Sequence, residues 1–279
     1  RYFMVSTPWP CLALTALYVL IVTKVGPAFM KNREPFNIRG LMVFYNFAMV
    51  LLSGYICWEF ALSGWLTGYS YGCQPVDYSH SPKALRMVDA VWWFWFSKFI
   101  EMLDTIFFIA RKKFSQVTFL HVFHHGALPF SYWTGLKYVP GGFGTMHAMI
   151  NSFIHFVMYM YYGIAAMGPE YQKYLWWKKY MTVMQMTQFV VVVIHSFQLM
   201  FIECDYPKPY AYAIGTYSAI FLVMFANFYR HAYAKSRRQR QAAKSQGKSH
   251  ANGIANGKKN GYVATNGVHA NGTTHKHHD

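Results

Sequence analysis

The chain has 279 residues, of which 54% are hydrophobic, 20% are aromatic and only 13% are charged, and its formal net charge is +16. An average soluble domain carries about 25% charged residues, and a soluble core can hide one apolar run of about 20 residues but not a series of them. This composition excludes an ordinary soluble domain, and it indicates a membrane protein whose basic charge follows topology rather than nucleic-acid binding.

Seven apolar runs are long enough to cross a bilayer. They cover residues 8–23, 40–62, 87–110, 116–134, 142–164, 180–202 and 210–229. Lys and Arg gather in alternate gaps, at 24–39, 111–113, 173–179 and after 230. Because cytoplasmic loops carry the excess of positive charge, we expect the C-terminus in the cytoplasm and the N-terminus on the other side. The sequence therefore predicts an all-α, polytopic membrane protein with seven transmembrane helices.

The chain divides by composition into a membrane domain, residues 1–234, and a tail, residues 235–279. The tail is basic at first and then consists of Asn-Gly repeats and terminal histidines, so it cannot bury a core and we expect it to be disordered. We interpret His275, His277 and His278 as part of this flexible end rather than as a metal site. Because the sequence begins at Arg1 without an initiator Met, we expect an N-terminal piece to be missing.

Two of the four cysteines lie in gaps that the predicted topology places on the same, non-cytoplasmic side. These are Cys73 and Cys204, whereas Cys11 and Cys57 lie within apolar runs. Disulfides form and persist in oxidising compartments. We therefore predict a disulfide between Cys73 and Cys204, with two free thiols as the alternative.

Ionisable side chains within the predicted spans are candidates for function, because placing them in a bilayer costs free energy. The third span carries Lys98, Glu101 and Asp104, at a spacing that puts them on one broad helical face. A salt-bridge network that only packs helices together is the structural alternative. The fourth span carries His121, His124 and His125 in the string HVFHH, which is hard to explain by packing alone.

The next two spans add polar groups, namely Asn151 and His155 in the fifth and Thr182, Gln185 and Gln188 in the sixth. A helix rises about 1.5 Å per residue. Counting from the predicted cytoplasmic ends places the polar groups of all four spans in the same half of the bilayer, so we predict that they form one site. His147 and His195 fall toward the other side and are left out of it.

A histidine cluster of this kind suits either a metal or acyl transfer. Membrane desaturases hold iron with several histidine boxes, but only one box is present here, so we expect no metal and no other cofactor. A neutral imidazole is a nucleophile and a general base near neutral pH, and a thioester is an activated acyl donor. Four lysines at the predicted cytoplasmic mouth could hold the phosphates of a CoA group, although topology explains them equally well. They are Lys112, Lys113, Lys178 and Lys179.

Four motifs together resemble the ELO family of very-long-chain fatty acid elongases. They are K-x-x-E-x-x-D-T at 98–105, H-x-x-H-H at 121–125, N-x-x-x-H-x-x-M-Y-x-Y-Y at 151–162 and T-x-x-Q-x-x-Q at 182–188. The resemblance covers residues 8 to 233, and it brings Tyr159 and Tyr162 into the predicted site. Phe123 is closer to the animal elongases of saturated and monounsaturated chains.

The resemblance implies an enzyme of the endoplasmic reticulum membrane, with a lumenal N-terminus and six helices forming a barrel around a closed-ended acyl tunnel. The implied reaction condenses a long acyl-CoA with malonyl-CoA to give a 3-oxoacyl-CoA, CO2 and CoA through an acylated histidine. We predict His124 as the nucleophile facing His155, with His121, His125 and Asn151 assisting. The residues expected to contact substrate are the four lysines together with Lys98, Glu101, Asp104, Tyr159, Tyr162, Thr182, Gln185 and Gln188.

The resemblance also implies partners, namely membrane lipid and the ketoreductase, dehydratase and enoyl reductase of the elongation cycle, while a homodimer is left open. We expect no nucleic acid. A non-catalytic seven-helix receptor or transporter is the alternative from another class, and it would spread its buried charged groups across the full depth of the bilayer.

Overall fold

The structure is a computed structural model that describes residues 2–231. The chain divides into one unit of Arg1–Asn227 and a second of Phe228–Asp279. The predicted boundary at residues 234 and 235, and the tail histidines beyond it, lie outside the described residues. Within the described part, every regular element is a helix and no strand occurs, as the sequence predicts.

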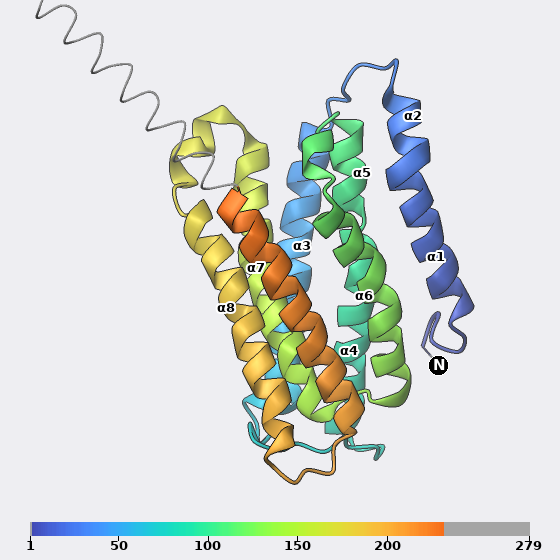
Figure 1. Cartoon of the computed structure of the whole chain (residues 1–279), viewed down its shortest axis with the longest axis vertical. Coiled ribbons are helices and arrows are strands. Elements are labelled where there is room, and N and C mark those ends of the chain that lie inside the picture. The colour runs from blue at the N-terminus through green and yellow to red at the C-terminus, as the bar shows by residue number, and fades with distance from the viewer. Residues whose placement is uncertain (1, 232–279) are drawn as a thin grey trace, which may run out of the picture. The chain divides into compact units, whose positions relative to one another are not determined.

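Each predicted span overlaps a helical segment of the structure (Figure 1). The first is formed by α1 (Trp9–Leu20), a wide π-type turn (Ile21–Val25) and α2 (Gly26–Met30), and the second by α3 (Arg39–Phe60) with a further π-type turn (Ala61–Trp65). The third is divided into α4 (Pro82–Glu101) and α5 (Leu103–Ala110). The remaining four are α6 (Phe119–Tyr138), α7 (Thr145–Met167), α8 (Lys178–Phe197) and a final helix, Lys208–His231.

Four helices are long and apolar enough to cross a membrane. They are Trp9–Met30, Arg39–Trp65, Lys178–Met200 and Lys208–His231. The helices α4, α6 and α7 do not meet that criterion. All three carry ionisable or histidine motif residues, which lower their hydropathy. The described chain is therefore a helical, multi-pass membrane protein.

Two helix boundaries differ clearly from the predicted ones, and local chemistry explains both. The first helix continues past residue 23 to Met30, because the amide of Gly26 reaches back to the carbonyl of Ile21 in a wide turn that accommodates Pro27. The helix α4 begins at Pro82 instead of residue 87, since Ser81 caps it by accepting a hydrogen bond from the amide of Ala84.

Proline and tryptophan fix the packing of α4 against α6. Pro129 lies inside α6, where it cannot donate the helical hydrogen bond to the carbonyl of His125. The indole Nε1 of Trp95 on α4 donates to the carbonyl of Pro129 over 2.8 Å, and Trp95 is completely buried. The turn of α6 that contains Pro129 thus lies shortly after the histidine string and is hydrogen-bonded to the helix that carries Lys98 and Glu101.

The helices α3 and α7 pack closely against each other along their length. Glycines face aromatic rings across this contact, with Gly54 against Phe156 and Gly163 against Phe47. A Cβ atom at Gly163 would lie 3.3 Å from the Phe47 ring. Small residues of this kind let membrane helices approach each other, and here they align the α7 motif with its neighbours.

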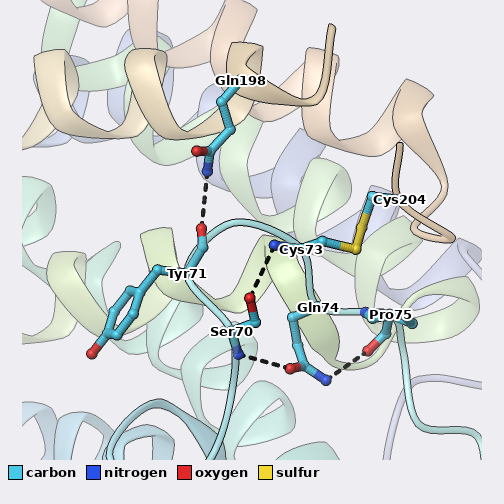
Figure 2. The surroundings of a disulfide bond; sticks show 7 residues. All are labelled: Ser70, Tyr71, Cys73, Gln74, Pro75, Gln198 and Cys204. Atoms are coloured by element: carbon cyan, nitrogen blue, oxygen red, sulfur yellow. Dashed lines mark hydrogen bonds between the residues drawn. A yellow bond between two sulfur atoms is a disulfide. The ribbon is translucent and has the colours of Figure 1, made fainter. Parts of the chain in front are cut away.

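A disulfide joins Cys73 to Cys204, the predicted pair, and links the loop before α4 to the loop after α8 (Figure 2). Hydrogen bonds reinforce this link: Gln198 Nε2 donates to the carbonyl of Tyr71 over 3.0 Å, and the amide of Phe143 donates to the carbonyl of Gln74 over 2.7 Å. The three loops between α3 and α4, between α6 and α7 and after α8 are therefore tied together at one end of the helices.

Replacing both half-cystines, as Cys73→Ser with Cys204→Ser, should lower the thermal midpoint in detergent substantially. A cross-link that closes a loop of more than 100 residues contributes up to about 4–5 kcal/mol by restricting the unfolded chain. Cys57→Ser, which removes a free and half-buried thiol, is the matched control and should leave the midpoint near that of the unchanged protein. Equal midpoints for the double variant and the control would show that the bond does not stabilise this fold.

Candidate functional site

A buried ion pair within α4 contacts α7 through Asn151. Lys98 and Glu101 are each only 2% exposed, and Lys98 Nζ lies 2.7 Å from Glu101 Oε1. Ser97 Oγ donates to the same carboxylate oxygen over 3.3 Å, and Lys98 Nζ also donates to Asn151 Oδ1 over 3.2 Å. Burying two charges is tolerated only when they are paired and hydrogen-bonded, so this arrangement sets the position of the Asn151 side chain.

His155 lies on the other side of the same carboxylate. Its Nδ1 atom is 3.2 Å from Glu101 Oε1, but the geometry is not that of a hydrogen bond. The second carboxylate oxygen, Glu101 Oε2, has no hydrogen-bond partner among the described residues. Lys98 Nζ and His155 Nδ1 thus both lie near Glu101 Oε1, whereas Glu101 Oε2 can still accept a hydrogen bond.

Asp104 and Thr105 form separate contacts, because the helix is interrupted at Met102 between Glu101 and the start of α5. Tyr159 of α7 donates to Asp104 Oδ2 over 2.7 Å. Thr105 Oγ1 lies 2.8 Å from His121 Nε2 and 2.8 Å from the hydroxyl of Tyr18 on α1. The third-span motif therefore reaches both the histidine string and α7.

The histidine string forms the start of α6, which Thr118 caps by accepting a hydrogen bond from the amide of His121. The ring centres of His121 and His125 lie 4.5 Å apart, and those of His124 and His125 lie 5.1 Å apart. Phe221 of the final helix meets His124 edge-on, with a centre-to-centre distance of 5.0 Å. His125 thus contacts both other imidazoles, and His124 is turned toward the final helix.

The sixth-span motif lies on α8. Gln185 Nε2 contacts Met158 Sδ of α7 over 3.5 Å, and Thr182 Oγ1 donates to the carbonyl of Lys178 in its own helix. Gln188 is buried and lines the cavity described next. Tyr162 packs against Tyr159 and Tyr161, at the edge of the cluster.

A partly open cavity of about 400 Å³ includes motif residues in its wall and is otherwise lined mainly by apolar side chains. Three motif side chains line it, namely His124, Asn151 and Gln188. Residues of α4, α6, α7, α8 and the final helix form the rest of the wall, among them Phe94, Leu128, Gly135, Val192 and Phe221. The wall of the cavity is therefore largely apolar, with His124, Asn151 and Gln188 among its polar groups.

The remaining predicted residues lie elsewhere. Lys113, Lys178 and Lys179 are exposed, and Lys112 donates to the carbonyl of Lys31 over 3.4 Å. No hydrogen bond or ion pair joins these four side chains to the buried motif residues within the part of the chain that the structure describes.

Two residues that the sequence analysis did not predict as site residues lie next to the motif residues. His147, which the depth argument leaves out, lines the same cavity as His124, and its Nδ1 donates to the carbonyl of Gly144. Its position one helical turn before Asn151 is a signal that could have identified it. Tyr18 reaches Thr105 from α1, which carries no motif, so only the folded structure reveals that contact.

For metal binding, the described residues contain no group of three or more His, Cys, Asp or Glu side chains arranged to hold an ion.

Comparisons with known proteins agree with this geometry. A family model described as "ELO: GNS1/SUR4 family" matches residues 3–241. Very long chain fatty acid elongase 7 of Rattus norvegicus is 53% identical over 240 residues, covering 85% of each chain. Very long chain fatty acid elongase 1 of Homo sapiens is 51% identical over 248 residues, covering 88% of this chain and 89% of its own. This chain therefore belongs to the ELO (GNS1/SUR4) family, as its four motifs imply.

Proposed function

We propose that this protein is a fatty-acid elongase that condenses a long-chain acyl-CoA with malonyl-CoA to give a 3-oxoacyl-CoA, CO2 and CoA. The observation that carries the proposal is the cavity, which joins His124, Asn151 and Gln188 to a long apolar interior. The names of the relatives support fatty-acid elongation independently of the geometry.

The proposed setting is the endoplasmic reticulum membrane, with seven spans, a lumenal N-terminus and a cytoplasmic C-terminus. Six of the spans would surround the acyl tunnel. The disulfide supports this orientation, because it ties the loops at one end of the helices and such bonds persist in an oxidising lumen. The exposed lysines at the ends of α5 and α8 support a cytoplasmic opposite end, where they would attract the phosphates of CoA.

The first proposed step transfers the acyl group to His124. The unprotonated ring nitrogen attacks the thioester carbon, a nitrogen–carbon bond forms and the carbon–sulfur bond breaks. The departing CoA thiolate takes the proton that the ring must lose, so the products are an acyl-imidazole and free CoA. Gln188, which lines the cavity, is placed to hydrogen-bond the thioester.

The second proposed step uses malonyl-CoA. Loss of CO2 leaves an enolate whose carbon attacks the acyl-imidazole, a carbon–carbon bond forms and the bond to His124 breaks. The released ring takes up one proton, which completes the balance. His125 contacts the ring of His124, and His121 contacts the ring of His125, so these two residues are placed to move that proton.

Asn151 is the donor that we assign to the developing oxyanion. Lys98 Nζ can only donate, so the Asn151 atom that faces it is the carbonyl oxygen Oδ1. The amide NH2 of Asn151 is therefore left to donate into the cavity that this residue lines. His155 does not line that cavity and lies against Glu101, where it would support the ion pair.

The proposal includes no metal or other cofactor, and its partners are membrane lipid, the two CoA substrates and the three later enzymes of the elongation cycle. The deciding experiment incubates purified protein with malonyl-CoA and a panel of acyl-CoAs and identifies the products by mass. Products heavier by two carbons and carrying a 3-oxo group are expected. A desaturated or hydroxylated product, or none at all with every acyl-CoA, would overturn the proposal.

Filling the cavity at Gly135 should restrict the enzyme to short acyl chains. A Cβ atom at Gly135 meets no heavy atom within 4 Å, so Gly135→Phe can project into the cavity without a backbone clash. Gly135 follows His124 by 11 residues of α6, and this segment rises about 16 Å. An extended chain advances about 1.2 Å per bond, so the block would lie roughly 13 bonds from the reactive carbon.

The measurement compares kcat/KM across a series of acyl-CoA lengths. We expect Gly135→Phe to retain activity on acyl chains shorter than the block and to lose it on longer ones. Gly40→Phe is the matched control, because Gly40 is an exposed helical glycine with equally open surroundings and lies outside the cavity. An unchanged length profile in Gly135→Phe would mean that the chain occupies another path.

A further inference from the structure

A continuous line of hydroxyl groups connects α1 to the histidine string. The hydroxyl of Tyr18 lies 2.8 Å from Thr105 Oγ1, which in turn lies 2.8 Å from His121 Nε2. Tyr18 is 4% exposed and Thr105 is fully buried. Around them pack Val22, Met30, Met102 and Ile109, which exclude polar alternatives from this region.

Counting donors and acceptors assigns the direction of these hydrogen bonds. Thr105 is the one hydrogen-bond partner that the structure gives the Tyr18 hydroxyl among the described residues. A buried phenol whose O–H is left without an acceptor costs free energy, so Tyr18 donates to Thr105 Oγ1. The single proton of the Thr105 hydroxyl is then free to point the other way, toward His121 Nε2.

His121 Nε2 must therefore be the acceptor nitrogen, and the ring proton must lie on Nδ1. The tautomer of a neutral imidazole follows from the hydrogen bond that its other nitrogen makes. The centre of the His121 ring lies 4.5 Å from that of His125, which in turn contacts His124. The tautomer of His121 therefore determines which of its two ring nitrogens can donate a proton and which can accept one.

We propose that Tyr18 is a positioning residue that acts through Thr105 to hold His121 in its Nδ1–H tautomer. This inference rests on the proposed function for its kinetic consequence, whereas the tautomer itself does not depend on that function. It also assigns a role to α1, which carries none of the four motifs. The helix would contribute one hydroxyl that fixes where the proton of His121 lies.

The direct experiment is nitrogen-15 NMR of the full chain labelled at its histidine side chains in lipid bilayers. The His121 signals are identified as those lost in His121→Gln. We expect the Nδ1–H tautomer in unchanged protein, and a mixture of tautomers in Tyr18→Phe, because a Thr105 hydroxyl that has lost its donor can also accept from His121. An Nε2–H tautomer in unchanged protein would overturn the proposal.

Kinetics test whether Tyr18 works through Thr105. We expect Tyr18→Phe to lower kcat about fivefold, the value of one hydrogen bond, with KM for both CoA substrates unchanged. Thr105→Val should lower kcat at least as much, Thr105→Ser should restore it, and adding Tyr18→Phe to Thr105→Val should cause no further loss. Additive losses in that double variant would contradict the proposal, because Tyr18 would then act by another route.

Tyr55→Phe is the matched control, since Tyr55 is 47% exposed on α3 and lies outside the site. The two proposals fail separately in these experiments. Protein with the Nδ1–H tautomer but no condensation of acyl-CoA with malonyl-CoA would overturn the proposed function alone. Active enzyme with the opposite tautomer at His121 would overturn the role of Tyr18 alone.

Discussion

Enzyme given acyl-CoA without malonyl-CoA should release one CoA per site and become heavier by one acyl group, and His124→Ala should do neither. The reason is the two-step scheme, in which the thioester is broken before the second substrate enters. His124 is the one member of the histidine string that lines the cavity, so its ring can meet the reactive carbon of a chain held there. Because His124 is the proposed acyl carrier, His124→Ala should also lose all detectable condensation.

The measurement combines a thiol assay for CoA with intact-mass and peptide mass spectrometry. His80→Ala, in the exposed loop before α4, is the control and should behave like the unchanged enzyme. A chelator should change neither the release nor the label. If CoA appears only after malonyl-CoA is added, the covalent step is wrong and direct condensation takes its place. A label on His125 or His155 would leave the elongase assignment intact and change only the nucleophile.

Much of the helical framework could be predicted from the sequence, because each apolar run is matched by a helical segment. The helix ends could not be predicted as well. The wide turn before Pro27 and the cap at Ser81 depend on single residues that periodicity does not weigh. The interruption at Met102 is also invisible in the pattern, yet it lets Glu101 face Lys98 while Asp104 turns to Tyr159.

The spacing of polar residues predicted which side chains would lie near each other but not their individual partners. The structure brings Lys98 of α4 to Asn151 of α7, and Asp104 of α5 to Tyr159 of α7. The depth argument left His147 out of the predicted site. The structure places His147 in the wall of the same cavity as His124, because that cavity extends along the helices and is lined by residues at several depths. Tyr18 could not be found from the sequence, since its contact depends on how α1 packs.

Asn151→Asp should lower kcat by about 10²–10³-fold while KM for acyl-CoA changes little, which is the usual cost of losing one donor to an oxyanion. The substitution is nearly isosteric. Its carboxylate can still accept from Lys98 Nζ, as Asn151 Oδ1 does over 3.2 Å, but it replaces the NH2 group with an oxygen that cannot donate. The tetrahedral oxyanion would then face an acceptor in place of a donor.

An oxyanion forms in both half-reactions, so Asn151→Asp should slow the release of CoA from acyl-CoA alone and also the later attack of the enolate. Rapid-mixing measurements of the two phases test this directly. Asn151→Ala removes the contact with Lys98 as well and should be no faster. Asn37→Asp makes the same chemical change in an exposed loop and should leave both phases unchanged. Rates in Asn151→Asp within about threefold of the unchanged enzyme, far from the loss expected for an oxyanion donor, would show that Asn151 does not have that role.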